Sequence, residues 1–98
     1  MTKITTQKDV EVPTAPAGLK VNSVNGSSVS LNWKTSVDNT KVKGYQIFCN
    51  GFKIATTTRT SYTVKSPVSL GIAVYWVKAY DLVGNFSGSS NCVTVFMF

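Results

Sequence analysis

Side chains that carry out chemistry are scarce in this 98-residue sequence. It contains no histidine, two cysteines and only four acidic residues. Without histidine, neither a Ser–His–Asp triad nor a Cys–His nucleophile can be assembled, and the commonest zinc ligand is missing. Asp9 and Glu11 stand in a polar leader, so an acid–base pair would have to be Asp38 with Asp81. The sequence therefore argues against an enzyme, and it predicts no catalytic, cofactor-binding or metal-binding residue.

The charge is strongly positive, with ten Lys and Arg against four Asp and Glu and a formal net charge of +6. An excess of positive charge of this size is typical of nucleic-acid-binding proteins. The basic residues are scattered along the chain, however, and form no run. Scattered lysines are typical of solvated faces and of protected edge strands, so no specific nucleic-acid partner is predicted.

No apolar run approaches the ~18 residues of a transmembrane helix, and no membrane insertion is predicted. The residues that follow Met1 are polar and lack the apolar centre of a secretory signal. Three explanations stay open: a signal was removed, the sequence starts inside a longer protein, or the chain is kept in the cytoplasm.

The elements that would position any site are short, alternating segments separated by turns. Residues 1–11 are expected to form a flexible leader or linker, and a folded domain is expected over residues 12–98. The predicted strands are Leu19–Val24, Val29–Trp33, Tyr45–Cys49, Phe52–Ala55, Thr60–Val64, Val74–Asp81 and Cys92–Phe96. Turn signals stand at Asn25-Gly26, Asn50-Gly51 and Gly84-Asn85. Seven short strands with turns every 8–12 residues predict an all-β Greek-key sandwich.

Four motifs in this order match a known pattern. They are Pro13…Pro16-x-x-Leu19-x-Val21, Ser28-Val29-x-Leu31-x-Trp33, Gly44-Tyr45-x-Ile47-Phe48-x-Asn50-Gly51 and Val77-Lys78-Ala79-Tyr80-Asp81-x-x-Gly84-Asn85-x-Ser87. The sequence thereby resembles the fibronectin type III domain, and most of all the version found in bacterial secreted carbohydrate-active enzymes. The resemblance implies a seven-stranded immunoglobulin-like sandwich of two sheets, with Trp33 and Tyr45 in the core.

Two features of that family are missing. The tyrosine that usually pins the loop before the sixth strand is replaced by Ala73, and the leucine of that loop by Pro67. The resemblance therefore leaves the Val64–Ala73 loop without its usual anchor. The Arg-Gly-Asp triplet of integrin-binding members is also absent, so cell adhesion by that route is not predicted.

The family fold would bring Asp38 and Asp81 to the same end of the sandwich. Together with Asn39 and Asn85 they raise the possibility of a weak Ca²⁺ site, because that ion takes six to eight oxygen ligands. The preferred interpretation is turn chemistry, in which Asp and Asn side chains bond their own backbone.

The resemblance also separates the two cysteines. Cys49 and Cys92 would lie on strands with a third strand between them, about 9.6 Å apart, beyond the ~7 Å limit of a disulfide. Alternation further turns Cys49 inward and Cys92 outward, so two free thiols are predicted.

Aromatic residues on the outer face of one sheet form the candidate partner-binding site. If Tyr75 points inward, Trp76 and Tyr80 on the same strand point outward. The same alternation turns Phe48 and Phe96 outward on the two neighbouring strands. Such residues are either ordinary cross-strand pairs or a contact surface, and both interpretations stay open.

Two functions are compatible with these features. The first is a non-catalytic interaction or spacer module of a larger secreted or surface assembly, accessory to carbohydrate-active modules. Its partner would be another protein domain, a like subunit or a polysaccharide. The alternative is a self-standing structural protein of a virion, a tail or another homo-oligomeric assembly made in the cytoplasm.

Overall fold

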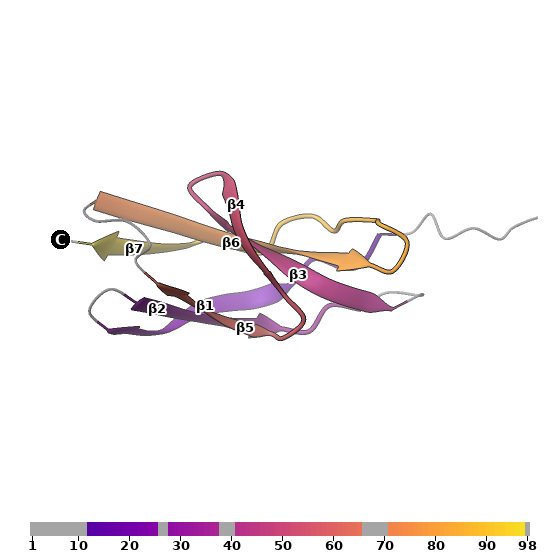
Figure 1. The fold of residues 1–98 in the computed structure, drawn as a ribbon, viewed down its shortest axis with the longest axis horizontal. Coiled ribbons are helices and arrows are strands. Elements are labelled where there is room, and N and C mark those ends of the chain that lie inside the picture. Colours follow the sequence, from indigo (N-terminus) through magenta and orange to yellow (C-terminus); the bar gives the residue numbers. More distant parts are fainter. Residues whose placement is uncertain (1–11, 26–27, 38–40, 66–70, 98) are drawn as a thin grey trace, which may run out of the picture.

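The computed structural model describes residues 12–25, 28–37, 41–65 and 71–97. The strands are β1 Ala17–Asn25, β2 Ser28–Lys34, β3 Val42–Cys49, β4 Phe52–Thr57, β5 Ser61–Lys65, β6 Gly71–Asp81 and β7 Val93–Met97. They form two antiparallel sheets in the orders β1-β2-β5 and β4-β3-β6-β7, which lie on one another as two layers (Figure 1). The predicted seven-stranded immunoglobulin-like sandwich is therefore confirmed.

Each predicted strand has a counterpart, although the boundaries move by a few residues. The largest changes are in β3 and β6, which begin at Val42 and Gly71, each three residues before the predicted start. Several features predicted from the sequence lie outside the described residues: the leader 1–11, Gly26, the pair Asp38-Asn39 and Pro67. The leader and the domain boundary therefore stay predictions.

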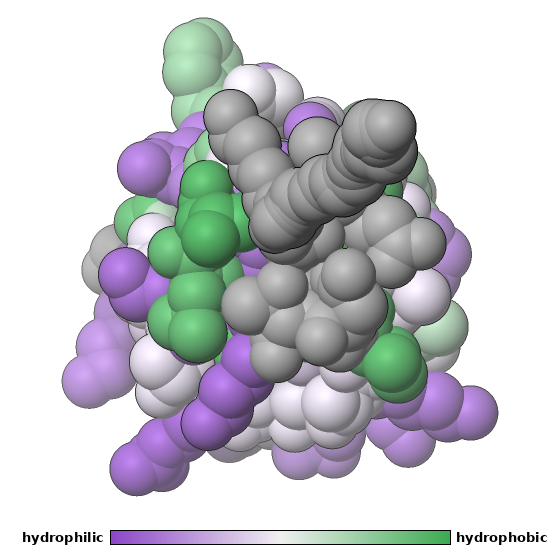
Figure 2. All heavy atoms as spheres, turned by 90° about the vertical axis from the view of Figure 1, so that its right-hand side faces the viewer, coloured by the Kyte–Doolittle hydropathy of each residue, from purple (hydrophilic) through white to green (hydrophobic). Residues whose placement is uncertain are grey.

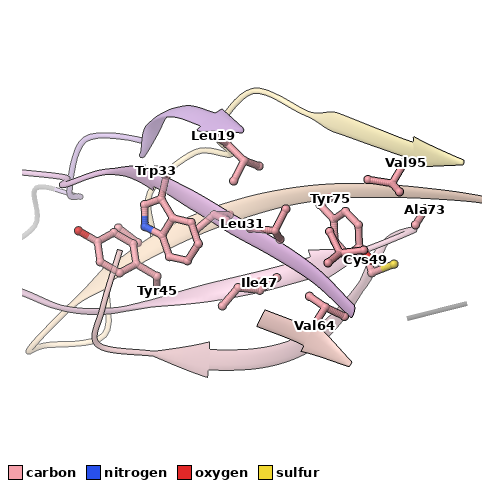
Figure 3. Close-up of a cluster of buried hydrophobic side chains, with 13 residues drawn as sticks. Leu19, Leu31, Trp33, Tyr45, Ile47, Cys49, Val64, Ala73, Tyr75 and Val95 are labelled. Carbon is pink, nitrogen blue, oxygen red and sulfur yellow. The ribbon is translucent and has the colours of Figure 1, made fainter. Parts of the chain in front are cut away.

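The core follows from the period of two in the sequence. Along β2 the buried residues are Val29, Leu31 and Trp33, and polar residues alternate with them. Because successive side chains of a strand point to opposite faces, such a segment buries one face only. The buried apolar residues are Leu19, Val29, Leu31, Trp33, Tyr45, Ile47, Cys49, Val64, Ala73, Tyr75, Val77, Ala79 and Val95. They come from both sheets and meet between them (Figure 3).

Trp33 and Tyr45 lie in this core, as the family resemblance implied, and join the two sheets. Their ring centroids are 5.5 Å apart with the planes at 67°, an edge-to-face contact that aromatic quadrupoles favour. The indole nitrogen lies on the side of the ring that faces Tyr45 (Figure 3). The Tyr45 hydroxyl accepts a hydrogen bond of 3.0 Å from the backbone N–H of Ser36. Tyr45 thus also holds the segment that leaves β2.

The turn between β3 and β4 anchors the start of β6. Asn50 and Gly51 have φ values of 51° and 91°, as a two-residue hairpin turn requires. The Asn50 amide donates to the Ile72 carbonyl at 3.1 Å and accepts from the Val74 N–H at 2.9 Å. Ala73, where the family usually has tyrosine, is fully buried between them. Asn50 therefore ties down the start of β6, where the usual tyrosine is missing.

We predict that Trp33→Ala lowers the free energy of unfolding by about 3–5 kcal/mol, because it removes a buried indole and leaves a cavity. Denaturant unfolding followed by circular dichroism measures the change. Trp76→Ala is the matched control, since Trp76 is only half-buried, and it should cost clearly less. A midpoint unchanged by Trp33→Ala would contradict the inward orientation of β2.

Candidate functional site

The candidate site is the outer face of the β4-β3-β6-β7 sheet. In β6 the buried residues alternate with Val74, Trp76, Lys78 and Tyr80, which point away from the core. The candidate aromatics Phe48, Trp76 and Tyr80 are half-buried there, whereas Phe96 on β7 is 63% exposed. The structure thus places all of the candidate aromatics on the predicted face.

Phe48 and Trp76 form the central contact of this face. They are opposite each other in the β3–β6 register, and their rings are nearly parallel, with an interplanar angle of 6° and centroids 5.8 Å apart. The Lys78 ammonium lies over the Phe48 ring, 5.7 Å from its centroid. A stacked aromatic pair with a cation beside it stabilises the sheet by itself. This cluster therefore serves as a cross-strand pair whether or not it meets a partner.

Tyr80 belongs to a second cluster. Its ring lies 6.0 Å from that of Phe86, tilted by 41°, and the two residues form an isolated β-bridge. Tyr80 also crosses Gly44, where an added Cβ would come 2.8 Å from the Tyr80 hydroxyl oxygen. Lys78 stands between Tyr80 and the stacked pair on the same face. Phe86 was not predicted, because only the path of the chain after β6 brings it beside Tyr80.

Phe96 makes a third group with Ile72, which lies opposite it in the β6–β7 register and is 51% exposed. Val74 and Thr94 form the row between this group and Trp76. The predicted aromatics are thus spread over one face in three groups, with Val74 linking two of them. Ile72 was not predicted, because it is aliphatic and the predicted surface consists of aromatic residues only.

The carboxylate of Asp81, the last residue of β6, forms hydrogen bonds within a turn. Its side chain is 1% exposed and accepts hydrogen bonds from the N–H groups of Val83 at 3.0 Å and Asn85 at 2.8 Å. The Asn85 amide donates to its second oxygen at 3.0 Å. The preferred turn chemistry is therefore confirmed for Asp81. Among the described residues no group of three or more His, Cys, Asp or Glu side chains is placed to hold a metal ion.

The end of the molecule at which β6 finishes exposes several aliphatic residues. Leu82 and Val83, in the turn that Asp81 holds, are 56% and 59% exposed, and Val37 beyond β2 is 68% exposed. Figure 2 views this end and shows apolar side chains in separate patches among polar ones. In the part of the chain that the structure describes, no helix is long and apolar enough to cross a membrane.

Comparison with known proteins places this architecture in a family. No protein-family model matches the sequence. The alpha-amylase of Niallia circulans is 43% identical over 96% of this chain, and exoglucanase B of Cellulomonas fimi is 35% identical over 93%. These matches cover 7% and 8% of the two enzymes, so the chain spans less than a tenth of their length.

Solved structures give the same result. Chitinase ChiA74 from Bacillus thuringiensis matches 95% of this chain with 34% identity and a TM-score of 0.84, over 14% of its own chain. FN3tt mut matches 86% of this chain and 92% of its own, with 26% identity and a TM-score of 0.62. The fibronectin type-III domain of human fibronectin type III domain containing protein 3 shares the fold at 19% identity. Its TM-score is 0.73, and the match covers 94% of this chain and 92% of that one.

The chain is a fibronectin type III domain. Its similarity to short segments of an amylase, an exoglucanase and a chitinase associates it with bacterial carbohydrate-active enzymes, as the resemblance implied.

The two cysteines of this fibronectin type III domain are free, as predicted. Cys49 is buried at the end of β3, Cys92 is exposed just before β7, and β6 lies between β3 and β7 in the sheet. Burial raises the pKa of the Cys49 thiol, and the neighbouring Tyr75 hydroxyl offsets this only in part. Since the thiolate is the reactive form, Cys49 is protected from thiol reagents both because it is buried and because it stays protonated.

We therefore predict that the two thiols react in two steps. With a thiol reagent at neutral pH, Cys92 should react quickly and Cys49 only after denaturant is added. A raised pKa also means that Cys49 needs a more alkaline solution than an ordinary thiol does to form its reactive thiolate. Two equally fast thiols in the folded protein would contradict the inward orientation of Cys49, and none after denaturation would reveal a disulfide.

Proposed function

We propose that this fibronectin type III domain is a non-catalytic accessory module of a larger, extracellular protein that acts on polysaccharide. The observation that carries the proposal is the pattern of the matches. Nearly all of this chain corresponds to a small part of enzymes named for starch, glucan and chitin. A segment that recurs in enzymes of different substrate specificity has a role other than catalysing the reaction of any one of them. The use of the Asp81 carboxylate by its own turn agrees with a non-catalytic role.

The contact surface proposed for this module is the aromatic face of the β4-β3-β6-β7 sheet, carried by Phe48, Trp76, Tyr80 and Phe96. Its proposed partner is an adjoining module of the same polypeptide. Phe48 and Trp76 stack on each other, and Lys78 lies over Phe48, so these rings offer edges more than the open faces that sugars stack on. Mixed aromatic and aliphatic groups such as Phe96 with Ile72 suit the apolar centre of a protein interface.

Segment exchange tests the accessory role. We predict that replacing the matching segment of the Niallia circulans alpha-amylase with residues 12–97 of this chain gives an enzyme with starch hydrolysis close to that of the parent. The isolated domain should release no reducing ends from starch, chitin or cellulose. An inactive exchange enzyme that is otherwise folded would contradict the accessory role. Release of reducing ends by the isolated domain would contradict the non-catalytic assignment.

A substitution in the exchange enzyme tests the contact surface. We predict that Trp76→Ser weakens docking by about 2 kcal/mol, as truncation of an interface anchor does. The measurement is the difference in unfolding free energy between the domain in the exchange enzyme and the isolated domain. Phe52→Ser is the matched control, because Phe52 is 75% exposed at the start of the β4 edge strand.

Three outcomes would contradict the proposed surface. One is that Trp76→Ser and Phe52→Ser reduce the docking free energy equally. Another is that the unfolding free energy of the domain is the same in isolation and in the exchange enzyme. The third is a dimer of the isolated domain in sedimentation that Trp76→Ser dissolves, because this would favour the alternative of a homo-oligomeric assembly.

A further inference from the structure

The outer face of the β1-β2-β5 sheet has a different character from the aromatic face. Because Val29, Leu31 and Trp33 point into the core, the residues between them and their cross-strand neighbours point outward. These outward residues are polar or basic, and they include Lys20, Ser30, Asn32, Lys34, Thr63 and Lys65. Within the described part of the chain, the one acidic residue is Asp81, which is buried in the other sheet. The face is therefore positively charged.

A break in the strand pairing opens a hollow in this face. The β1–β2 register shifts between the pairs Ala17–Lys34 and Lys20–Asn32, where Gly18 has a φ of +64°. The hollow has a volume of about 420 Å³ and is lined by Gly18, Lys20, Asn32, Trp33 and Lys34. This volume lies in the range of pockets that bind small molecules, ~300–1,000 Å³.

Gly18 makes room for one of the two lysines. A Cβ at Gly18 would come within 3.4–3.5 Å of three carbons of the Lys34 side chain, which therefore runs across the glycine backbone. Lys34 is held beside the hollow in this way, and Lys20 approaches from the neighbouring strand. Two lysines line one hollow, and the described chain has no exposed carboxylate, so the hollow suits an anionic ligand.

The side chain of Asn32 indicates a second chemical group that a ligand of this hollow would carry. Its side-chain oxygen is buried and has no hydrogen-bond partner among the described residues. A buried acceptor without a donor is unfavourable, because it has lost its hydrogen bonds to water. A hydroxyl group on a ligand beside the lysines would supply that donor. The hollow therefore fits a ligand that carries both an acidic group and a hydroxyl group.

We propose that this hollow binds an acidic sugar unit of a carboxylated polysaccharide. Lys20 and Lys34 bind the carboxylate, and Asn32 accepts a hydrogen bond from a sugar hydroxyl. The row that holds Ser30 and Thr63, whose hydroxyl oxygens are 3.3 Å apart, continues the polar surface toward Lys65 and accommodates the next units of the chain. The choice of polysaccharide over other polyanions rests on the proposed function, whereas the anionic character rests on the lysines.

The test uses the isolated domain with polygalacturonate as the probe. Lys20→Gln/Lys34→Gln should weaken binding roughly tenfold or more, because it removes the charge-assisted hydrogen bonds to the carboxylate. The control, Lys43→Gln/Lys53→Gln, removes the same number of charges from exposed positions on the other sheet and should change binding little. Asn32→Ala should weaken binding without changing its salt dependence, since it removes an acceptor and no charge.

Several results would overturn the inference. They are no binding of polygalacturonate at low salt, an equal loss in the two double variants, equal binding of neutral dextran, or tighter binding of oligodeoxythymidylate. This experiment does not depend on the exchange enzyme. Lysine-dependent polygalacturonate binding together with an inactive exchange enzyme would refute the proposed function alone, and the reverse pattern would refute this inference alone.

Discussion

The pairing of β3 with β6 is the constraint on which the rest of the structure depends. These two strands lie at the centre of the larger sheet, and their register sets Tyr45 opposite Ala79 and Ile47 opposite Val77, all of which are buried. The same register sets Phe48 opposite Trp76 on the outer face. A slip of one residue would exchange the two faces of β6 and expose Tyr75 in place of Trp76. The buried core and the candidate surface therefore both follow from the register between β3 and β6.

The core was predictable because its information is local. Strict alternation in Val29–Trp33 is enough to assign the buried side of β2, and the resemblance to the family then implies that Trp33 and Tyr45 lie in the core. The outward orientation of Phe48, Trp76, Tyr80 and Phe96 followed from the same alternation. Free cysteines followed from the strand order that the resemblance supplied.

What the sequence could not provide depends on residues far apart in the chain. The grouping of the aromatics needs the cross-strand register, which separates Tyr80 and Phe96 from the stacked pair. Asn50 was recognised as a turn residue, but its bonds to Ile72 and Val74 exist only once β3 and β6 are paired. The hollow beside Gly18 likewise comes from a register shift, and composition alone shows only scattered lysines.

The two sheets give the domain two outer faces of opposite chemistry on one closed core. One is aromatic and is proposed to meet a protein neighbour, and the other is basic and hydroxyl-rich and is proposed to meet an acidic polysaccharide. A sandwich permits this division because its inward residues form the core between the sheets, while the outward residues of both sheets face away from it. A module with these two faces could hold a larger enzyme against its substrate without taking part in the reaction.

Nuclear magnetic resonance of the isolated domain tests the β3–β6 register most directly. This register predicts nuclear Overhauser contacts between the rings of Phe48 and Trp76, and backbone contacts between Tyr45 and Ala79 and between Gln46 and Lys78. Ring contacts of Trp76 with the core residues Leu31 or Ile47, in place of Phe48, would show that β6 faces the other way. That result would contradict both the aromatic face and the core described here.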